Sequence, residues 1–168
     1  MLKPKKKKNS KITYVAIGVG ALVIALVIFY YYSADQAKNR GEYFGNSLKN
    51  VQDDLKQTQT EFYSKKKMLE ENSITKEEFL KYTATHIQNI QNVLKRYDGL
   101  VPPQSFASSL KLFKLSTQKQ LESDQFLIDW IRTNDTSNKI RSDLLLQESF
   151  ENEIAALDLF NKAKNRSN

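Results

Sequence analysis

The stretch ITKEEF, residues 74–79, is the strongest local structural signal in this 168-residue sequence. Thr75 and Glu78 have the spacing of a capping box, in which each side chain bonds the backbone N–H of the other residue. Ile74 and Phe79 occupy the two positions of a hydrophobic staple, which fixes the angle at which the chain enters a helix. The stretch therefore predicts a helix that begins at about residue 76.

This helix is predicted to end near residue 98, because Gly99 follows and Pro102-Pro103 prevents its continuation. Between these signals, mostly apolar residues recur at helical spacing and form one broad face. The face comprises Phe79, Tyr82, His86, Ile87, Ile90, Val93, Leu94 and Tyr97. A helix with such a face is expected to pack against other helices.

Three further helices are predicted by apolar residues at helical spacing. The first, 44–69, carries Phe44, Leu48, Val51, Leu55, Thr58, Phe62 and Leu69. The third, 104–133, carries Phe106, Leu110, Phe113, Leu121, Leu127, Ile128 and Ile131. The fourth, 138–164, carries Ile140, Leu144, Leu146, Phe150, Ile154 and Leu157. Four amphipathic helices with short connections predict an all-α fold, an antiparallel up-down-up-down four-helix bundle over residues 44–168.

Composition supports this fold class. Five glycines and three prolines are too few for a β-sandwich or barrel, which needs a turn every eight to twelve residues or so. The absence of cysteine excludes disulfides, zinc–thiolate sites and thiol catalysis. The domain must therefore be held together by packing alone.

Residues 12–32 carry no charged side chain and would rise about 31 Å as a helix, close to the thickness of a bilayer core. A secretory signal peptide has a shorter apolar region followed by small residues at its cleavage site. Here the apolar run ends instead in the bulky residues 29–32, Phe-Tyr-Tyr-Tyr. We therefore predict a retained transmembrane signal-anchor helix.

The flanks of this span predict its orientation. Aromatic rings favour the lipid headgroups, and the expected interface anchors are Tyr14, Tyr30, Tyr31 and Tyr32. Lysines mark the cytoplasmic side, and the topogenic patch comprises Lys3, Lys5, Lys6, Lys7, Lys8 and Lys11. Residues 1–11 are thus a predicted cytoplasmic tail and 33–43 a short stalk, with a flexible point at two glycines. The bundle is expected outside the cytoplasm, with membrane lipid as one partner.

The formal charge of +7 alone would suggest a nucleic-acid partner. All 19 acidic residues, however, follow residue 34, and 20 of the 26 basic residues lie there with them. The positive excess is therefore confined to the N-terminal tail, and we predict no nucleic-acid binding.

His86 is the sole histidine and lies in the middle of an apolar face. We favour a core histidine with a polar partner over a metal ligand, because Thr83 stands where the Glu-x-x-His motif of di-iron bundles needs a glutamate. Residues 33–168 contain no glycine-rich phosphate loop and no nucleophile elbow. We expect no enzymatic activity, no cofactor and no metal.

The third helix carries more apolar residues than one face requires. A second stripe, about 180–240° around the helix from Phe106, comprises Leu112, Leu115, Phe126 and Trp130. These residues either pack against a neighbouring helix or form a surface for a partner or a second copy, since tryptophan is enriched at binding hot spots. We treat this stripe as the candidate interaction surface.

These features predict a non-enzymatic module of the cell envelope that binds another envelope protein, a ligand or a second copy of itself. The alternative is a structural scaffold that forms a coiled coil through the seam of residues 44–69. An accessory subunit of a membrane assembly is a third class with the same sequence features.

Overall fold

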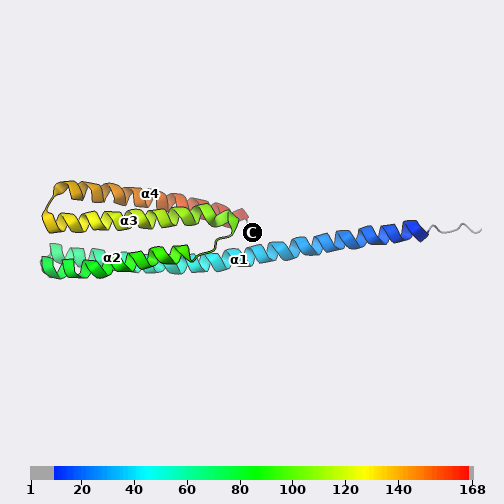
Figure 1. Cartoon of the computed structure of the whole chain (residues 1–168), viewed down its shortest axis with the longest axis horizontal. Helices are drawn as coiled ribbons and strands as arrows, with labels where there is room; N and C mark the ends of the chain where they lie inside the picture. Colours follow the sequence, from blue (N-terminus) through cyan, green and yellow to red (C-terminus); the bar gives the residue numbers. More distant parts are fainter. Residues whose placement is uncertain (1–9, 167–168) are drawn as a thin grey trace, which may run out of the picture. The chain divides into compact units, whose positions relative to one another are not determined.

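The computed structural model describes the backbone of residues 10–166 and the side chains of residues 39–166 (Figure 1). Its α-helices are α1 (Ser10–Glu70), α2 (Lys76–Asp98), α3 (Ala107–Thr133) and α4 (Thr136–Arg166), with one 3-10 turn, η1 (Gln104–Phe106), before α3. Residues 10–166 contain no β-strand. The predicted all-α class and the number of helices in the bundle are therefore confirmed.

The chain divides into two units, residues 1–39 and residues 40–168. In the first unit the structure gives the helical backbone of α1 from Ser10 onward. The predicted span at 12–32, its tyrosine anchors and the lysines of the tail all lie outside the residues whose side chains are described. Within the part that is described, no helix is long and apolar enough to cross a membrane.

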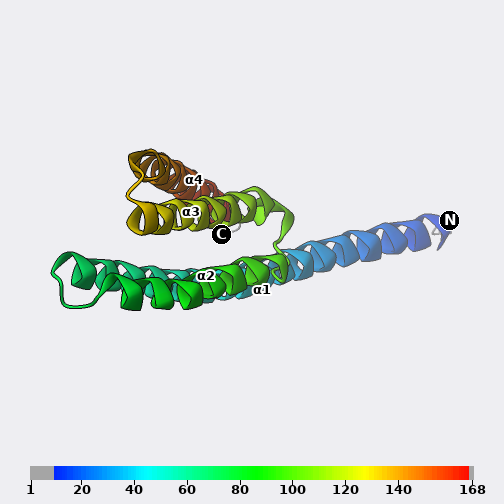
Figure 2. The same ribbon diagram turned by 60° about the vertical axis from the view of Figure 1, so that its left-hand side comes forward.

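The second unit is a helical bundle in which successive helices run in opposite directions (Figures 1 and 2). Two asparagines with positive φ mark the turns between α1 and α2 and between α3 and α4: Asn72 at 56° and Asn134 at 59°. Asparagine is one of the few residues that enter this left-handed region readily. The backbone N–H of Asn134 also caps α3 by donating to the carbonyl of Trp130, at 2.7 Å.

The start of α2 confirms the predicted capping box. The backbone N–H of Thr75 donates to Glu78 Oε2 at 2.7 Å, and the N–H of Glu78 donates to Thr75 Oγ1 at 3.2 Å. The bond from the Thr75 N–H, together with a second one from Thr75 Oγ1 to the same Glu78 Oε2 at 2.9 Å, favours the ionised carboxylate and holds the pKa of Glu78 below its usual value. Ile74 packs in the same apolar cluster as Phe79, as a hydrophobic staple requires.

Two apolar clusters form the core of residues 40–166. The Phe44 cluster draws on α1, α2, η1, α3 and α4, and comprises Phe44, Leu48, Val51, Val93, Tyr97, Phe106, Phe113, Ala156 and Ala163. The Phe62 cluster draws on α1, α2 and α3, and comprises Phe62, Phe79, Leu127, Ile128 and Ile131. The buried residues that α4 adds to these clusters are thus two alanines in its C-terminal half.

The predicted core face of the fourth helix is wrong. Five of its six residues are between 46% and 68% exposed: Ile140, Leu144, Phe150, Ile154 and Leu157. The residues that α4 buries are small and recur every seven positions: Ser142, Ser149, Ala156 and Ala163. Helix α4 therefore packs mainly through a stripe of serine and alanine, with Phe160 added beside the Phe44 cluster, and turns these five large apolar residues away.

The reason lies on the facing surface of α3, which buries serines at the same spacing: Ser109, Ser116 and Ser123. Ser149 Oγ donates to the Ser116 carbonyl at 2.9 Å, and Ser123 Oγ donates to the Ser142 carbonyl at 2.8 Å. The side-chain oxygens of Ser116 and Ser149 are 3.2 Å apart. Only small side chains permit such close approach of two helices. The seven-residue spacing of these small residues is therefore the sequence signal that indicates how α4 packs on α3.

Two glycines of α1 lie beside aromatic rings of the bundle. A Cβ atom added at Gly45 would lie 3.6 Å from Phe160 Cζ, and one at Gly41 would lie 3.5 Å from Phe106 Cε2. Both distances are ordinary van der Waals contacts. Helix α1 runs through both glycines without interruption, while the flexible point expected there stays a prediction.

Replacing Gly45 by alanine is expected to stabilise the protein. The added methyl group fits, and alanine is favoured over glycine inside a helix by about 1 kcal/mol. We expect urea denaturation, followed by far-UV circular dichroism, to show Gly45→Ala more stable by about that amount. A loss of stability in Gly45→Ala would contradict the contact with Phe160.

Candidate functional site

The most unusual surface of the described residues is an exposed apolar stripe on α4, here called the α4 face: Ile140, Leu144, Phe150, Ile154 and Leu157. At 100° per residue the five side chains fall within an arc of about 140°. They are five of the nine large apolar residues that are exposed, so exposure is concentrated on one helix and is not scattered. A contiguous patch of this kind is typical of an interaction site.

The α4 face points away from α3 because of how α4 is attached. Its buried stripe, centred between Ser149 and Ala156, lies roughly opposite on the helix, about 160° around the axis. In both views the N-terminal part of α4 lies on the far side of α3 from the hairpin of α1 and α2 (Figures 1 and 2), while its C-terminal part also contacts α1 through Phe160. The α4 face is therefore held outward by a rigid contact on the other side of the same helix.

Acidic residues accompany this apolar face. Between Arg141 and Lys162 the sequence has no basic residue and five acidic ones: Asp143, Glu148, Glu151, Glu153 and Asp158. Asp143 and Asp158 each contact a lysine one turn away, Lys139 and Lys162, at 2.6 Å. Such exposed pairs contribute little to stability, about 0–1 kcal/mol. The middle of the α4 face is thus both apolar and acidic.

The structure places the predicted interaction surface of α3 along its flank toward α4. Lys139 Nζ lies 5.9 Å from the centre of the Trp130 ring, and Arg141 Cζ lies 5.6 Å from that of Phe126. Leu112 packs against the Phe44 cluster and Trp130 against the Phe62 cluster. Leu115 is the most exposed of these four side chains, at 37%, and the other three are half-buried. Binding of a partner by this stripe stays a prediction.

A polar centre lies between helices α1, α2 and α3. His86 and Asp124 are both fully buried, and His86 Nε2 lies 2.8 Å from Asp124 Oδ2. The same carboxylate accepts from Gln59 Nε2 at 2.9 Å and from Gln120 Nε2 at 3.0 Å. The imidazole stacks on Phe62, with ring centres 4.0 Å apart. The expected core histidine with a polar partner is confirmed.

This centre has the properties of a structural junction. Its imidazole is fully buried, stacked on the ring of Phe62, with the centre of the Tyr82 ring 6.4 Å away. Among the side chains of residues 39–166, two buried atoms have no hydrogen-bond partner within the chain, Gln59 Oε1 and His86 Nδ1. Burial and the nearby Asp124 carboxylate raise the pKa of Tyr63 to about 12, so its phenol stays neutral. Among the described residues, no group of three or more metal-binding side chains is arranged to hold a metal ion.

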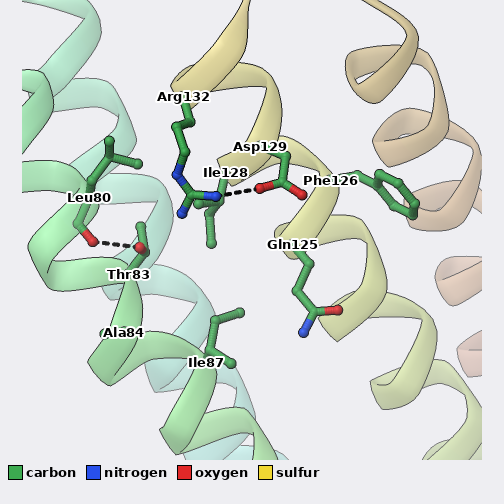
Figure 3. Close-up of a pocket in the computed structure, with 9 residues that line it drawn as sticks. All are labelled: Leu80, Thr83, Ala84, Ile87, Gln125, Phe126, Ile128, Asp129 and Arg132. Carbon is green, nitrogen blue, oxygen red and sulfur yellow. Dashed lines mark hydrogen bonds and ion pairs between the residues drawn. The ribbon is translucent and has the colours of Figure 1, made fainter. Parts of the chain in front are cut away.

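A groove of about 520 Å³ lies between α2 and α3 (Figure 3). Its apolar walls include Leu80 and Ile128, and at one end Arg132 Nη1 lies 2.6 Å from Asp129 Oδ1. Thr83 Oγ1 donates to a backbone carbonyl of its own helix, at 2.7 Å. The charged and hydroxyl groups of the groove are thus already paired with each other or with backbone, which makes it a weaker candidate than the α4 face.

Comparison with known proteins yields no relative: no family model, no curated protein and no solved structure matches this chain. The function must therefore be argued from the surface and contacts of the molecule.

Proposed function

We propose that this chain is a non-enzymatic protein-interaction module that binds a partner protein through the α4 face. The observation that carries the proposal is the exposure of five large apolar side chains on one side of a helix whose other side is packed. Sequence reasoning missed this site because it assigned the same five residues to the core.

Docking on the α4 face would be driven by the hydrophobic effect. Full burial of one Leu, Ile or Phe side chain contributes about 1.5–3 kcal/mol, and these five are roughly half exposed. Five such residues therefore offer a gain of several kcal/mol, as an order of magnitude. Their spacing along one face matches the anchors by which helices dock into grooves or against other helices.

The proposal includes a membrane anchor at residues 12–32 and an antiparallel up-down-up-down bundle on the extracytoplasmic side. The support is the charge-free length of that segment and the six lysines before it. An anchored module would meet its partner on the membrane surface, which raises the local concentration of both.

The second candidate function is a coiled-coil scaffold built on the seam of α1. Its apolar residues Phe44, Val51 and Phe62 are buried within the chain's own core. A seam that is already covered has less apolar surface to offer a second chain, so the α4 face is the better-supported site.

Site-specific photo-crosslinking tests the proposed function. We expect a photoreactive residue in place of Ile154, in the full chain in its native membrane, to give a discrete adduct of higher mass. The matched control is the same residue in place of Gln91, an exposed polar position of α2. Adducts from Trp130 or Leu115 but not from positions 154 and 150 would instead assign the interface to the flank of α3.

A further inference from the structure

We infer that the partner of the α4 face is a basic amphipathic helix. The inference rests on the proposed function and specifies the chemistry of its partner. Its basis is the charge of the α4 face, which carries acidic and no basic residues between Arg141 and Lys162.

Three of the acidic residues lie within the arc of the apolar side chains. At 100° per residue, Asp143, Glu151 and Asp158 fall between the directions of Phe150 and Leu144. A partner that covers the apolar residues must also cover these carboxylates. Covering a carboxylate without pairing it is costly, whereas a lysine or arginine at the edge of the partner's apolar stripe compensates for the lost water.

Glu151 is the carboxylate nearest the middle of the face, and it accepts a hydrogen bond from the neutral amide of Gln147, at 2.8 Å. Asp143 and Asp158 contact lysines on the solvent-exposed surface, where an ion pair exchanges its partner at little cost. Asp143 and Asp158 would therefore have to exchange a lysine for an incoming cation, whereas Glu151 is bonded by a neutral amide and is directly available to a cation of an incoming helix. An ion pair between such a cation and Glu151 would contribute most to binding.

The same charges argue against two other occupants of the α4 face. A second copy would join through a two-fold axis, which places the same surface patch on both sides of the interface. Because the acidic residues are centred within the apolar stripe, two α4 faces would bring like charges together. An anionic membrane surface attracts polybasic segments and would be repelled by this one.

The first test measures binding of model helices to the full chain in a neutral detergent. The probe is a fluorescein-labelled 18-residue peptide of leucine and lysine with leucines on one helical face. We expect it to bind at least tenfold more tightly than a matched leucine–glutamate helix or a scrambled leucine–lysine peptide, by fluorescence anisotropy. Affinity should fall as salt is raised, because the flanking ion pairs are screened. Equal binding of the acidic helix would overturn the inference.

Variants tie this binding to the α4 face. We expect Glu151→Gln with Asp158→Asn to weaken the leucine–lysine helix about tenfold, and Ile154→Ser to weaken it by a similar factor. Glu77→Gln, which removes an exposed carboxylate at the start of α2, is the matched control and should leave affinity unchanged. Binding that none of the α4 variants alters would place the peptide elsewhere and overturn the inference.

Crosslinking tests the interaction function independently of the chemical class of the partner. An adduct from position 154 without preferential binding of the basic helix would keep the interaction function and refute its basic partner. Self-association of the full chain that Ile154→Ser abolishes, measured by analytical ultracentrifugation, would assign the face to a second copy and also refute it.

Discussion

Asp124→Ala is expected to lower the free energy of unfolding by about 3–5 kcal/mol, the usual cost of breaking a buried polar pair by removing one member. The carboxylate is fully buried and accepts hydrogen bonds from Gln59 and Gln120 as well as contacting His86 Nε2. Its removal leaves the two glutamine amides without an acceptor and His86 Nε2 without its partner, on three different helices. Urea denaturation followed by circular dichroism measures the change.

Three further variants show whether the loss comes from the buried pair. Asp124→Asn keeps one acceptor oxygen and should lose less than the alanine variant. Asp129→Ala removes an exposed carboxylate paired with Arg132, five residues along the same helix, and should cost less than about 1 kcal/mol. Replacing both His86 and Asp124 by leucine should recover part of the loss, since apolar replacement of a whole buried pair is often tolerated. A loss below 1 kcal/mol in Asp124→Ala would contradict the buried contact.

The helices and their ends could be predicted because their signals are local. The capping box of Thr75 and Glu78 spans four residues and forms as expected. The seam of α1 was also predicted correctly at Phe44, Leu48, Val51 and Phe62, which are all buried. A large apolar residue at helical spacing identifies an element and one of its faces.

What covers a face could not be predicted from periodicity. The apolar stripe of α4 and that of α1 look alike in sequence, yet one is exposed and the other buried. Serines and alanines on α3 and α4 determine which side of α4 is buried, because their small size permits a close contact that larger side chains would prevent. The partner of His86 was missed for a related reason, because Asp124 lies 38 residues away and only tertiary packing brings the two together.

Ser149→Leu tests this account of α4 and is expected to lower the free energy of unfolding by about 3 kcal/mol. Ser149 Oγ lies 3.2 Å from Ser116 Oγ, so a leucine fits only if the two helices separate. Overpacking costs about 1–3 kcal/mol, and each lost hydrogen bond adds about 1 kcal/mol. Urea denaturation of the variant beside the wild-type chain measures the change.

Two controls separate bulk from hydrogen bonding. Ser149→Ala keeps the close spacing of the helices and should lose only the hydrogen-bond contribution, about 1 kcal/mol. Gln147→Leu adds the same leucine at an exposed position two residues away and should change stability by less than about 0.5 kcal/mol. If Ser149→Leu were as stable as Gln147→Leu, the serine stripe would not be the buried side of α4. The stripe from Ile140 to Leu157 would then be free to pack inside the bundle, and the case for a docking face on α4 would fail with it.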